Sequence, residues 1–247
     1  MNPAEFNNIA RSERDFWWYR GMREILFRIL DPIAKAKPAA RVLEAGCGTG
    51  HLSLTLGERY GWNMIPLDLG REGLEFARGY GLDRLVQANA GALPFGDATF
   101  DLALSMDVIV HFEPGQEQSA FDELSRVLLP GGLAVIRVSA LDILRSRHSE
   151  FAHERQRFTK RRLLDAARRA GLTPLRCAYL NSILMPVAFA KFRIWEPLTN
   201  AAPASGVEPV SGWLDRILYS ALWLESRWLG FGAAFPAGQS LLLIARK

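Results

Sequence analysis

A glycine-rich turn between a short apolar run and an amphipathic segment constrains this chain more than any other feature. Residues 41–50 read Arg-Val-Leu-Glu-Ala-Gly-Cys-Gly-Thr-Gly, and the amphipathic residues 51–60 follow them. A buried strand, a tight turn and a helix in this order form a nucleotide-type binding element. Glycine lets the backbone pass close to a ligand, and the first N–H groups of the helix point into the loop.

The spacing of the glycines excludes two common phosphate-binding loops. Gly46, Gly48 and Gly50 are separated by single residues, which is not G-x-G-x-x-G, and no Gly-Lys-Ser/Thr ending of a P-loop follows. Glu44 lies directly before the loop, where a carboxylate would repel phosphate. The loop therefore favours a ligand with a cationic group; the alternative is an ordinary strand–turn–helix without a ligand.

Length and composition indicate one large α/β domain, or one domain with an insertion. The net charge of +4 in 247 residues does not by itself indicate nucleic-acid binding. Cys47 and Cys177 form no Cys/Cys or Cys/His metal spacing, so we expect neither a disulfide framework nor a metal site. The sequence shows no signal peptide and no apolar run of the ~18–20 residues that span a membrane. We therefore expect a cytoplasmic protein.

The string Glu44 to Gly50 resembles motif I of the class I S-adenosylmethionine (SAM)-dependent methyltransferases, type 11 small-molecule subgroup. The resemblance spans nearly the whole chain and is strongest from Arg41 to Gly132. It implies an α/β, Rossmann-like fold with a seven-stranded, mostly parallel sheet, an antiparallel last strand and helices on both faces. It also implies SAM as cofactor and S-adenosylhomocysteine as product. In this interpretation Glu44 lies near the ammonium group of SAM, and the loop residues contact its methionine part: Gly46, Cys47, Gly48 and Gly50.

Asp68 is the next expected cofactor residue. It ends the strand predicted over residues 62–67, where an acid can accept hydrogen bonds from both ribose hydroxyls. With Leu69 it resembles the family's D-hydrophobic-S turn. The alternative is that Asp68 only caps the helix that begins near Arg71.

The adenine end of the site is expected at Asn89 and Ala90, after a third strand predicted over residues 82–88. An Asp-Ala pair at this position commonly holds the adenine amino group in the family. Asparagine replaces the acid here, and its amide oxygen can accept the same hydrogen bond. Ala90 would offer its backbone N–H to the ring.

Met106 and Asp107 follow the strand predicted over residues 100–106 and are expected to line the cofactor pocket. Methyltransferases that act on exocyclic amines of adenine carry a D/N-P-P-Y/F tetrad at this position. This chain has Ser-Met-Asp-Val instead, and no cysteine nucleophile of the cytosine-C5 type. The resemblance therefore implies that nucleic acid is not the substrate.

The first 38 residues are expected to form a helical cap, with a helix over residues 6–30. An aromatic face could attract a sulfonium cation, and an arginine could pair with the carboxylate of SAM. On this hypothesis Arg20 contacts the cofactor, whereas Trp18 and Tyr19 contact the substrate. The alternative is a helix that packs on the core by its aromatic face.

The segment after the fifth strand, predicted over residues 133–138, should be the most substrate-specific part of the core. It resembles a subgroup pattern that contains two histidines, here His148 and His153, and an arginine pair that Gln156 interrupts here, so that Arg157 is its second member. Arg147 and Arg157 are the arginines expected to bind the substrate. A neutral histidine can act as a general base near neutral pH, and arginines would favour an acidic or phosphorylated acceptor. His111 is a third acid/base candidate. The alternative is a solvated basic loop.

The remaining chain divides into a core over residues 39–180, an apolar insertion over 181–238 and a last core strand over 239–247. The insertion predicts helices over 183–195 and 213–229, separated by a linker over 199–206. Its apolar helices fit a buried insertion or a homodimer interface. They also fit a lid over a lipophilic acceptor, or peripheral contact with a membrane.

The functional expectation is methyl transfer by in-line displacement to a small molecule, lipophilic or acidic: a secondary metabolite, a quinone or a lipid-linked compound. The protein must position the acceptor, exclude water and take up a proton where the nucleophile carries one. Two alternatives are a SAM-binding scaffold without catalysis and aminopropyl transfer by a related fold. A basic loop in place of an acidic polyamine pocket disfavours the latter.

Overall fold

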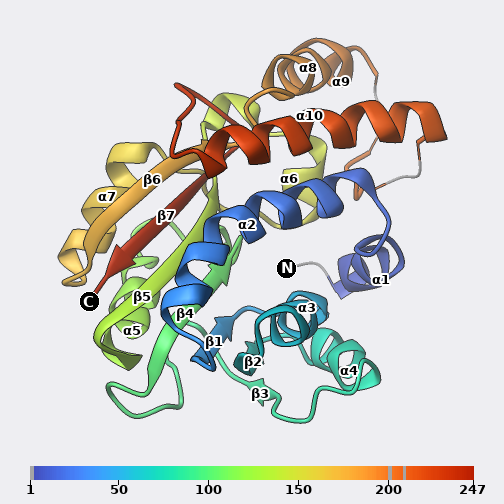
Figure 1. Ribbon diagram of the computed structural model, residues 1–247. Helices are drawn as coiled ribbons and strands as arrows, with labels where there is room; N and C mark the ends of the chain where they lie inside the picture. Colours follow the sequence, from blue (N-terminus) through green and yellow to red (C-terminus); the bar gives the residue numbers. More distant parts are fainter. Residues whose placement is uncertain (1–2, 200–201, 208–209) are drawn as a thin grey trace.

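A seven-stranded sheet organises the computed structural model, which describes residues 3–199, 202–207 and 210–247 (Figure 1). The strand order is β3-β2-β1-β4-β5-β7-β6. Strands β1 to β5 pair in parallel, and β7 pairs antiparallel with β5 and β6. The predicted fold, including the antiparallel last strand, is confirmed. The strands are β1 (Arg41–Ala45), β2 (Asn63–Asp68), β3 (Val86–Gln87), β4 (Phe100–Met106), β5 (Leu128–Ser139), β6 (Thr173–Leu180) and β7 (Ser240–Arg246).

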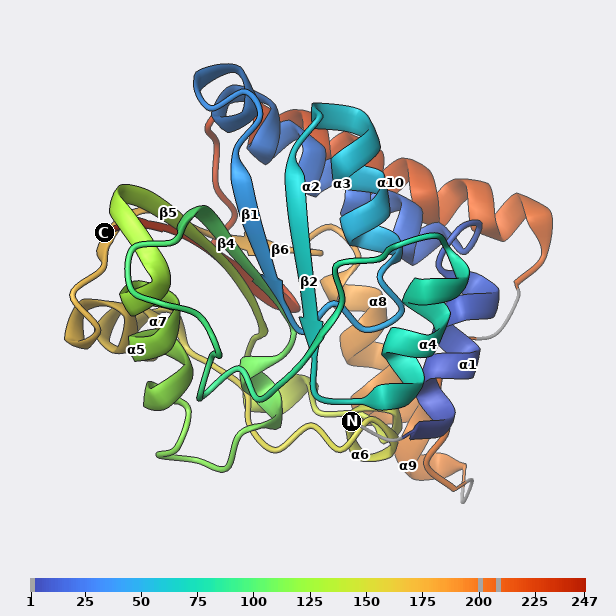
Figure 2. The same ribbon diagram turned by 90° about the horizontal axis from the view of Figure 1, so that it is seen from below.

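Helices cover both faces of this sheet, as Figures 1 and 2 show. In β4, Leu102 and Leu104 belong to one core layer and Ala103 to the other, as the alternation of strand side chains requires. The first layer includes side chains of α2 (Trp17–Ala36), α3 (His51–Tyr60) and α10 (Gly212–Gly230), and the second includes those of α5 (Gln118–Val127) and α7 (Lys160–Arg169). Shorter or peripheral elements are α1 (Pro3–Ser12), α4 (Arg71–Gly79), η1 (Ile109–His111), η2 (Asp142–Leu144) and α6 (Arg147–Phe151).

The N-terminal segment differs from the single helix that the sequence predicts over residues 6–30. It forms α1 and α2, because the chain turns at residues 13–15 and Phe16 adopts an extended conformation before α2. Helix α2 also continues through Pro32 to Ala36. An internal proline removes one backbone hydrogen bond, but Ile33 packs against the apolar core beyond it.

Two predicted strands have different lengths in the structure. The third contains only Val86 and Gln87, and the residues from 82 to 85 form no regular structure. The fifth begins at Leu128 and not at residue 133, because Leu128 already pairs with Phe100 across a register shift. Pro130, Gly131 and Gly132 are therefore part of β5.

The segment between β6 and β7 is helical, as the sequence predicts, and α10 matches the predicted helix over residues 213–229 to within one residue at each end. Helix α8 (Met185–Ala190) continues as a π-helical turn, η3 (Lys191–Trp195), and as α9 (Glu196–Leu198). Residues 200–201 of the predicted linker lie outside the described residues. Helix α10 packs along α2, where Gly21 lies directly opposite Leu222. The carboxylate of Glu225 accepts hydrogen bonds from the backbone N–H groups of Ser182 (2.8 Å) and Ile183 (3.0 Å), which ties α10 to the end of β6.

Candidate functional site

A cavity of about 1450 Å³ opens at the carboxyl ends of β1, β2, β4 and β5. This is the edge of a parallel α/β sheet at which ligands generally bind. Residues from every expected motif line it, and so do the N-terminal helices and the helices between β6 and β7. Because a ligand pocket usually measures about 300–1,000 Å³, the cavity can hold a nucleoside-sized cofactor and a second molecule together.

The glycine loop and the tip of β2 are joined by Asp68. Its Oδ2 atom accepts a hydrogen bond from the N–H of Gly48 (2.8 Å), and its Oδ1 atom accepts one from Gly70 (2.7 Å). Burial raises the pKa of this carboxyl. Each carboxylate oxygen has two acceptor sites, so one on each oxygen remains for a ribose hydroxyl. The contact with Gly70 also caps the N-terminus of α4, which is the role that the alternative interpretation predicted for Asp68.

All three loop glycines adopt backbone conformations with positive φ, which other residues rarely tolerate. Gly46 has φ +88°, and a Cβ atom there would lie 2.0 Å from the Cγ2 of Val108. Gly48 has φ +56° and open space on its Cβ side. Gly50, which starts α3, does not line the cavity; a Cβ there would lie 2.6 Å from the Cβ of Ala77. Its glycine serves helix packing and not the ligand surface.

Glu44 is a buried acid in the cavity wall. It accepts a hydrogen bond from the Oγ atom of Ser53, and no ion pair found among the described residues includes it. Burial raises the pKa of Glu44 to about 8. A buried carboxyl without a cationic partner at the edge of a cavity suits a ligand ammonium group. The residues around the loop therefore fit the amino-acid end of SAM.

Leu69, Asn89 and Ala90 line the part of the cavity beyond Asp68. The side chain of Leu69 is 66% exposed and offers an apolar surface. The Oδ1 atom of Asn89 already accepts a hydrogen bond from the N–H of Gly91 (2.8 Å) and keeps one acceptor site.

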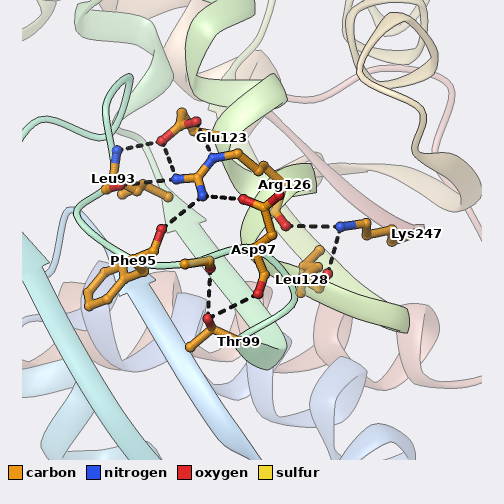
Figure 3. A network of polar contacts seen from close by, with 9 residues as sticks. Leu93, Phe95, Asp97, Thr99, Glu123, Arg126, Leu128 and Lys247 are labelled. Carbon is orange, nitrogen blue, oxygen red and sulfur yellow. Dashed lines mark hydrogen bonds and ion pairs between the residues drawn. The ribbon is translucent and has the colours of Figure 1, made fainter.

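Arg126 of α5 fixes the loop that follows Asn89 and Ala90 (Figure 3). Its guanidinium donates to the carbonyl oxygens of Leu93 (3.1 Å) and Phe95 (2.8 Å) and pairs with Asp97 (2.7 Å). Glu123 pairs with Arg126 (2.7 Å) and also accepts from the N–H of Leu93 (2.6 Å). This network ties the loop after Ala90 to α5.

Met106 and Asp107 line the cavity at the tip of β4. Asp107 has φ +57° and pairs with Arg137 of β5 at 2.5 Å. The second carboxylate oxygen, Oδ1, is buried without a hydrogen-bond partner in the described structure. The guanidinium of Arg137 also lies 5.4 Å from the centre of the Trp18 ring. The sequence did not identify Arg137, because a single arginine within a strand gives no signal.

The three candidate histidines occupy different positions. His111 lines the cavity, and its Nδ1 atom lies 3.1 Å from the carbonyl oxygen of His153. Burial lowers the pKa of His111 below the ordinary 6.5. His148 lines the cavity too, half-exposed, with Nδ1 3.9 Å from the carboxylate of Glu5. The side chain of His153 is not part of the cavity wall.

The N-terminal residues are only partly placed as predicted. Trp18 and Tyr19 line the cavity. Arg20 does not, because its guanidinium pairs with Asp215 (3.2 Å) and lies 4.3 Å from the centre of the Tyr219 ring. Arg20 thus connects α2 to α10, and the structure gives no contact that would bring it to the cofactor.

The arginines of the substrate-side loop line the cavity but are engaged within the protein. Arg157 pairs with Glu154 (2.7 Å) and donates to Ser149 (3.0 Å). Arg147 donates to the hydroxyl of Thr199 (2.9 Å) and to the backbone carbonyl of Glu196. These contacts stabilise the loop and connect it to α9, so the two arginines are engaged within the protein, whereas the alternative interpretation expected a solvated loop.

Glu13 is a site residue that the sequence analysis missed. It lies in the turn between α1 and α2 and lines the cavity. Its carboxylate accepts hydrogen bonds from Thr49 in the glycine loop (2.5 Å) and from Tyr80 (2.9 Å). Arg23 donates to its backbone carbonyl. One acid in a polar turn carries no sequence signal, so only the fold reveals this contact.

No group of three or more His, Cys, Asp or Glu side chains in the described part of the chain is placed to hold a metal ion. Within residues 3–199, 202–207 and 210–247, no helix is both long and apolar enough to cross a membrane.

Comparison with known proteins identifies relatives for this architecture. A family model described as a methyltransferase domain matches residues 43–136. A malonyl-[acyl-carrier protein] O-methyltransferase from Enterobacter lignolyticus is 33% identical over 182 residues, which are 70% of each chain. A 24-methylenesterol C-methyltransferase 2 from Oryza sativa subsp. japonica is 34% identical over 44% of this chain and 31% of its own length. A probable tRNA methyltransferase 9B from Bos taurus is 36% identical over 50% of this chain and 26% of its own length. The chain thus spans less than a third of the length of the last two relatives.

Solved structures show the same fold. A SAM-dependent methyltransferase from Archaeoglobus fulgidus superposes with a TM-score of 0.60 at 18% identity, covering 95% of this chain and 97% of that one. A methyltransferase in complex with the Trm112 activator from Haloferax volcanii gives a TM-score of 0.59 at 20% identity, covering 100% and 98%. Geranyl diphosphate C-methyltransferase from Streptomyces coelicolor, bound to S-adenosyl-L-homocysteine, superposes with a TM-score of 0.55 at 19% identity. The match covers 85% of this chain and 70% of that one. Sequence match, sheet topology and site geometry agree: the chain belongs to the class I SAM-dependent methyltransferases.

Proposed function

We propose that this methyltransferase acts on a lipophilic small molecule, which is held between the cofactor site and the helices that follow β6. The observation that carries the proposal is the continuity of the cavity. It extends from the glycine loop to a wall formed by α8 and α10, where the lining side chains include Leu184, Ala188, Leu214 and Leu218. An apolar wall with few polar groups is typical of a small-molecule site.

In this proposal, different core residues bind different parts of the cofactor. Glu44 would bind the ammonium group, Asp68 the ribose hydroxyls, and Asn89 with Ala90 the adenine. When bound, SAM supplies a methyl group on a sulfonium centre. The protein's own residues then orient the acceptor and exclude water. Trp18 and Tyr19 of α2 would close the cavity over the reacting groups.

We assign the general base to His111. A backbone carbonyl can only accept a hydrogen bond, so the contact with the carbonyl of His153 places the imidazole proton on Nδ1. Nε2 of the neutral ring then has a free electron pair. A side chain in the cavity wall with this tautomer and a lowered pKa can take a proton from an acceptor hydroxyl or amine. His148 is the second candidate, at the side of the cavity formed with Glu5.

The relatives differ in what their names describe as acceptors. Two of them are named for a sterol and a carrier-bound malonyl group, and one for tRNA. For this chain, the apolar wall of the cavity and the absence of the D/N-P-P-Y/F tetrad favour a lipophilic or lipid-linked acceptor. A SAM-binding scaffold without catalytic activity would need neither the apolar wall nor a histidine that is fixed in one tautomer.

Calorimetric titration with SAM tests the cofactor assignment. We expect micromolar-scale affinity for the unaltered protein, and Asp68→Ala should weaken it by at least about 100-fold, because it removes an acceptor for two charge-assisted hydrogen bonds. Asp83→Ala, an exposed acid outside the cavity, is the matched control. Tight SAM binding by Asp68→Ala would overturn the assignment. Transfer of labelled methyl groups to a lipid extract of cells separates an enzyme from an inert scaffold.

A further inference from the structure

Helix α10 presents an apolar face to solvent. Its buried side packs on α2. On the opposite side, large apolar residues recur at helical spacing from residue 213 to residue 231. Six large apolar side chains form this exposed face: Trp213 (66% exposed), Ile217 (57%), Trp223 (41%), Leu224 (56%), Trp228 (53%) and Phe231 (81%). Isolated exposed apolar residues need no explanation, but a contiguous row of six along one helix indicates an interaction surface.

The charges of α10 are sorted between its two sides. The exposed side carries Arg216 and Arg227, and Arg227 lies 5.8 Å from the centre of the Trp223 ring. Both acids point inward, since Asp215 pairs with Arg20 and Glu225 is fully buried. The exposed side of α10 is therefore apolar and basic, without an acidic group between residues 212 and 231.

The segment from α8 to α9 carries a second group of exposed apolar side chains. Val187, Ile194, Trp195 and Leu198 are between 58% and 77% exposed. Lys191 and Arg193 are exposed among them, whereas Glu196 is half-buried and accepts a hydrogen bond from the N–H of Arg147. In Figure 1, α8, α9 and α10 all lie at the upper end of the molecule, beyond α2, and Figure 2 shows α8 and α9 apart from α10.

We propose that these helices dock the protein on an anionic lipid bilayer. Tryptophan and aliphatic side chains with flanking arginines are suited to the headgroup region, where a helix lies in the plane of the membrane. A second copy of the chain fits less well, because a two-fold interface would place this basic face against itself without acids to pair. Anionic phospholipid headgroups supply the complementary charge.

Docking has a consequence for the cavity. Trp195 and Lys191 belong to the exposed surface and also line the cavity wall. The acceptor side of the cavity would therefore lie next to the bilayer. Membrane binding itself requires neither SAM nor an acceptor, so its test is independent of the proposed reaction.

Vesicle flotation tests the proposal with the full chain. We expect binding to vesicles of phosphatidylcholine with roughly a third phosphatidylglycerol, and weak binding to phosphatidylcholine alone. Arg216→Gln and Arg227→Gln should each lower the partition coefficient about fivefold, and Leu224→Ser about tenfold. The matched controls on other elements are Arg161→Gln and Leu175→Ser, which are 93% (side chain) and 49% exposed.

Several results would overturn the proposal. One is the absence of binding to anionic vesicles; another is equal binding by Leu224→Ser and Leu175→Ser. A third is a stable dimer, seen by sedimentation velocity, that Leu224→Ser dissociates while vesicle binding is unchanged. Thermal melting of each variant confirms that the chain remains folded, which is expected because all five side chains are exposed.

Discussion

The Nδ1 atom of His111 lies 3.1 Å from the backbone carbonyl oxygen of His153, across 42 residues of chain. This contact fixes one tautomer of the His111 ring. The partner atom is the backbone carbonyl oxygen of His153 and not an atom of its side chain. In the proposed mechanism, His111 is the base and His153 is the residue whose main chain orients it, so the side chain of His153 should be dispensable.

We predict that His111→Gln lowers kcat by about 10²–10⁴-fold and leaves SAM affinity nearly unchanged, because general-base catalysis contributes on that scale. The matched control is His153→Asn. Residue 153 has φ +57°, which asparagine tolerates well, and the substitution keeps the carbonyl. Steady-state kinetics with an identified acceptor provide the measurement. Equal losses in the two variants would argue against this division of roles.

The pH dependence of kcat/KM independently tests the proposal that His111 is the base. Because burial lowers the pKa of His111 below 6.5, the base is deprotonated throughout the neutral range. The acidic limb of kcat/KM should therefore lie below about pH 6.5, with a plateau above it. An acidic limb centred well above this value would assign the limb to another group.

The sequence predicted those candidate site residues that lie at the carboxyl ends of strands. Glu44 precedes the loop at the end of β1, and Asp68 ends β2, so the parallel register brings both to one edge of the sheet. Arg20 was assigned wrongly, because its partner Asp215 lies 195 residues away and only tertiary packing reveals it. The contact between Glu13 and Thr49 was missed for the same reason. Similarly, α10 is apolar on nearly all sides in sequence, and only its packing on α2 shows which side stays exposed.

Glu44 should couple SAM binding to proton release. In the ligand-free protein burial raises its pKa to about 8, so the carboxyl is mostly protonated at about pH 6.5. A bound ammonium group favours the carboxylate and would release this proton. We expect close to one proton released at pH 6.5, measured by calorimetry in buffers of different ionisation enthalpy, and less for Glu44→Gln.

The same group affects stability without ligand. The folded chain retains the proton to a higher pH than an unfolded chain, whose pKa is near 4.5. The stability that this group contributes is therefore complete below about pH 4.5 and is lost as the pH rises towards about 8. Glu44→Gln should reduce that decline in thermal melts between about pH 5 and 8. An unchanged decline would show that Glu44 stays ionised in the folded protein.

Glu13 should stabilise the closed position of the N-terminal helices over the cavity. Tyr80→Phe removes one of the two hydrogen bonds to its carboxylate, and Glu13→Ala removes both. With about 0.5–1.5 kcal/mol for a hydrogen bond, we expect SAM affinity to fall up to tenfold for Tyr80→Phe and further for Glu13→Ala. Arg71, which is exposed and forms an ion pair with Glu75, provides a control as Arg71→Gln. Unchanged SAM affinity in both variants would separate Glu13 from the cofactor site.

Gly21 sets the distance between α2 and α10. A Cβ atom there would lie 2.4 Å from the Cδ1 and 2.5 Å from the Cβ of Leu222, so Gly21→Ala forces the two helices apart. We expect a loss of about 1–3 kcal/mol in the free energy of unfolding, as overpacking in cores generally costs. Gly57→Ala in α3 is the matched control, because its Cβ would meet its nearest neighbour at an ordinary 3.6 Å. That change should instead stabilise the chain by about 0.5–1 kcal/mol. Urea unfolding of the two variants measures the difference, and equal stability would mean that the helices separate at no cost.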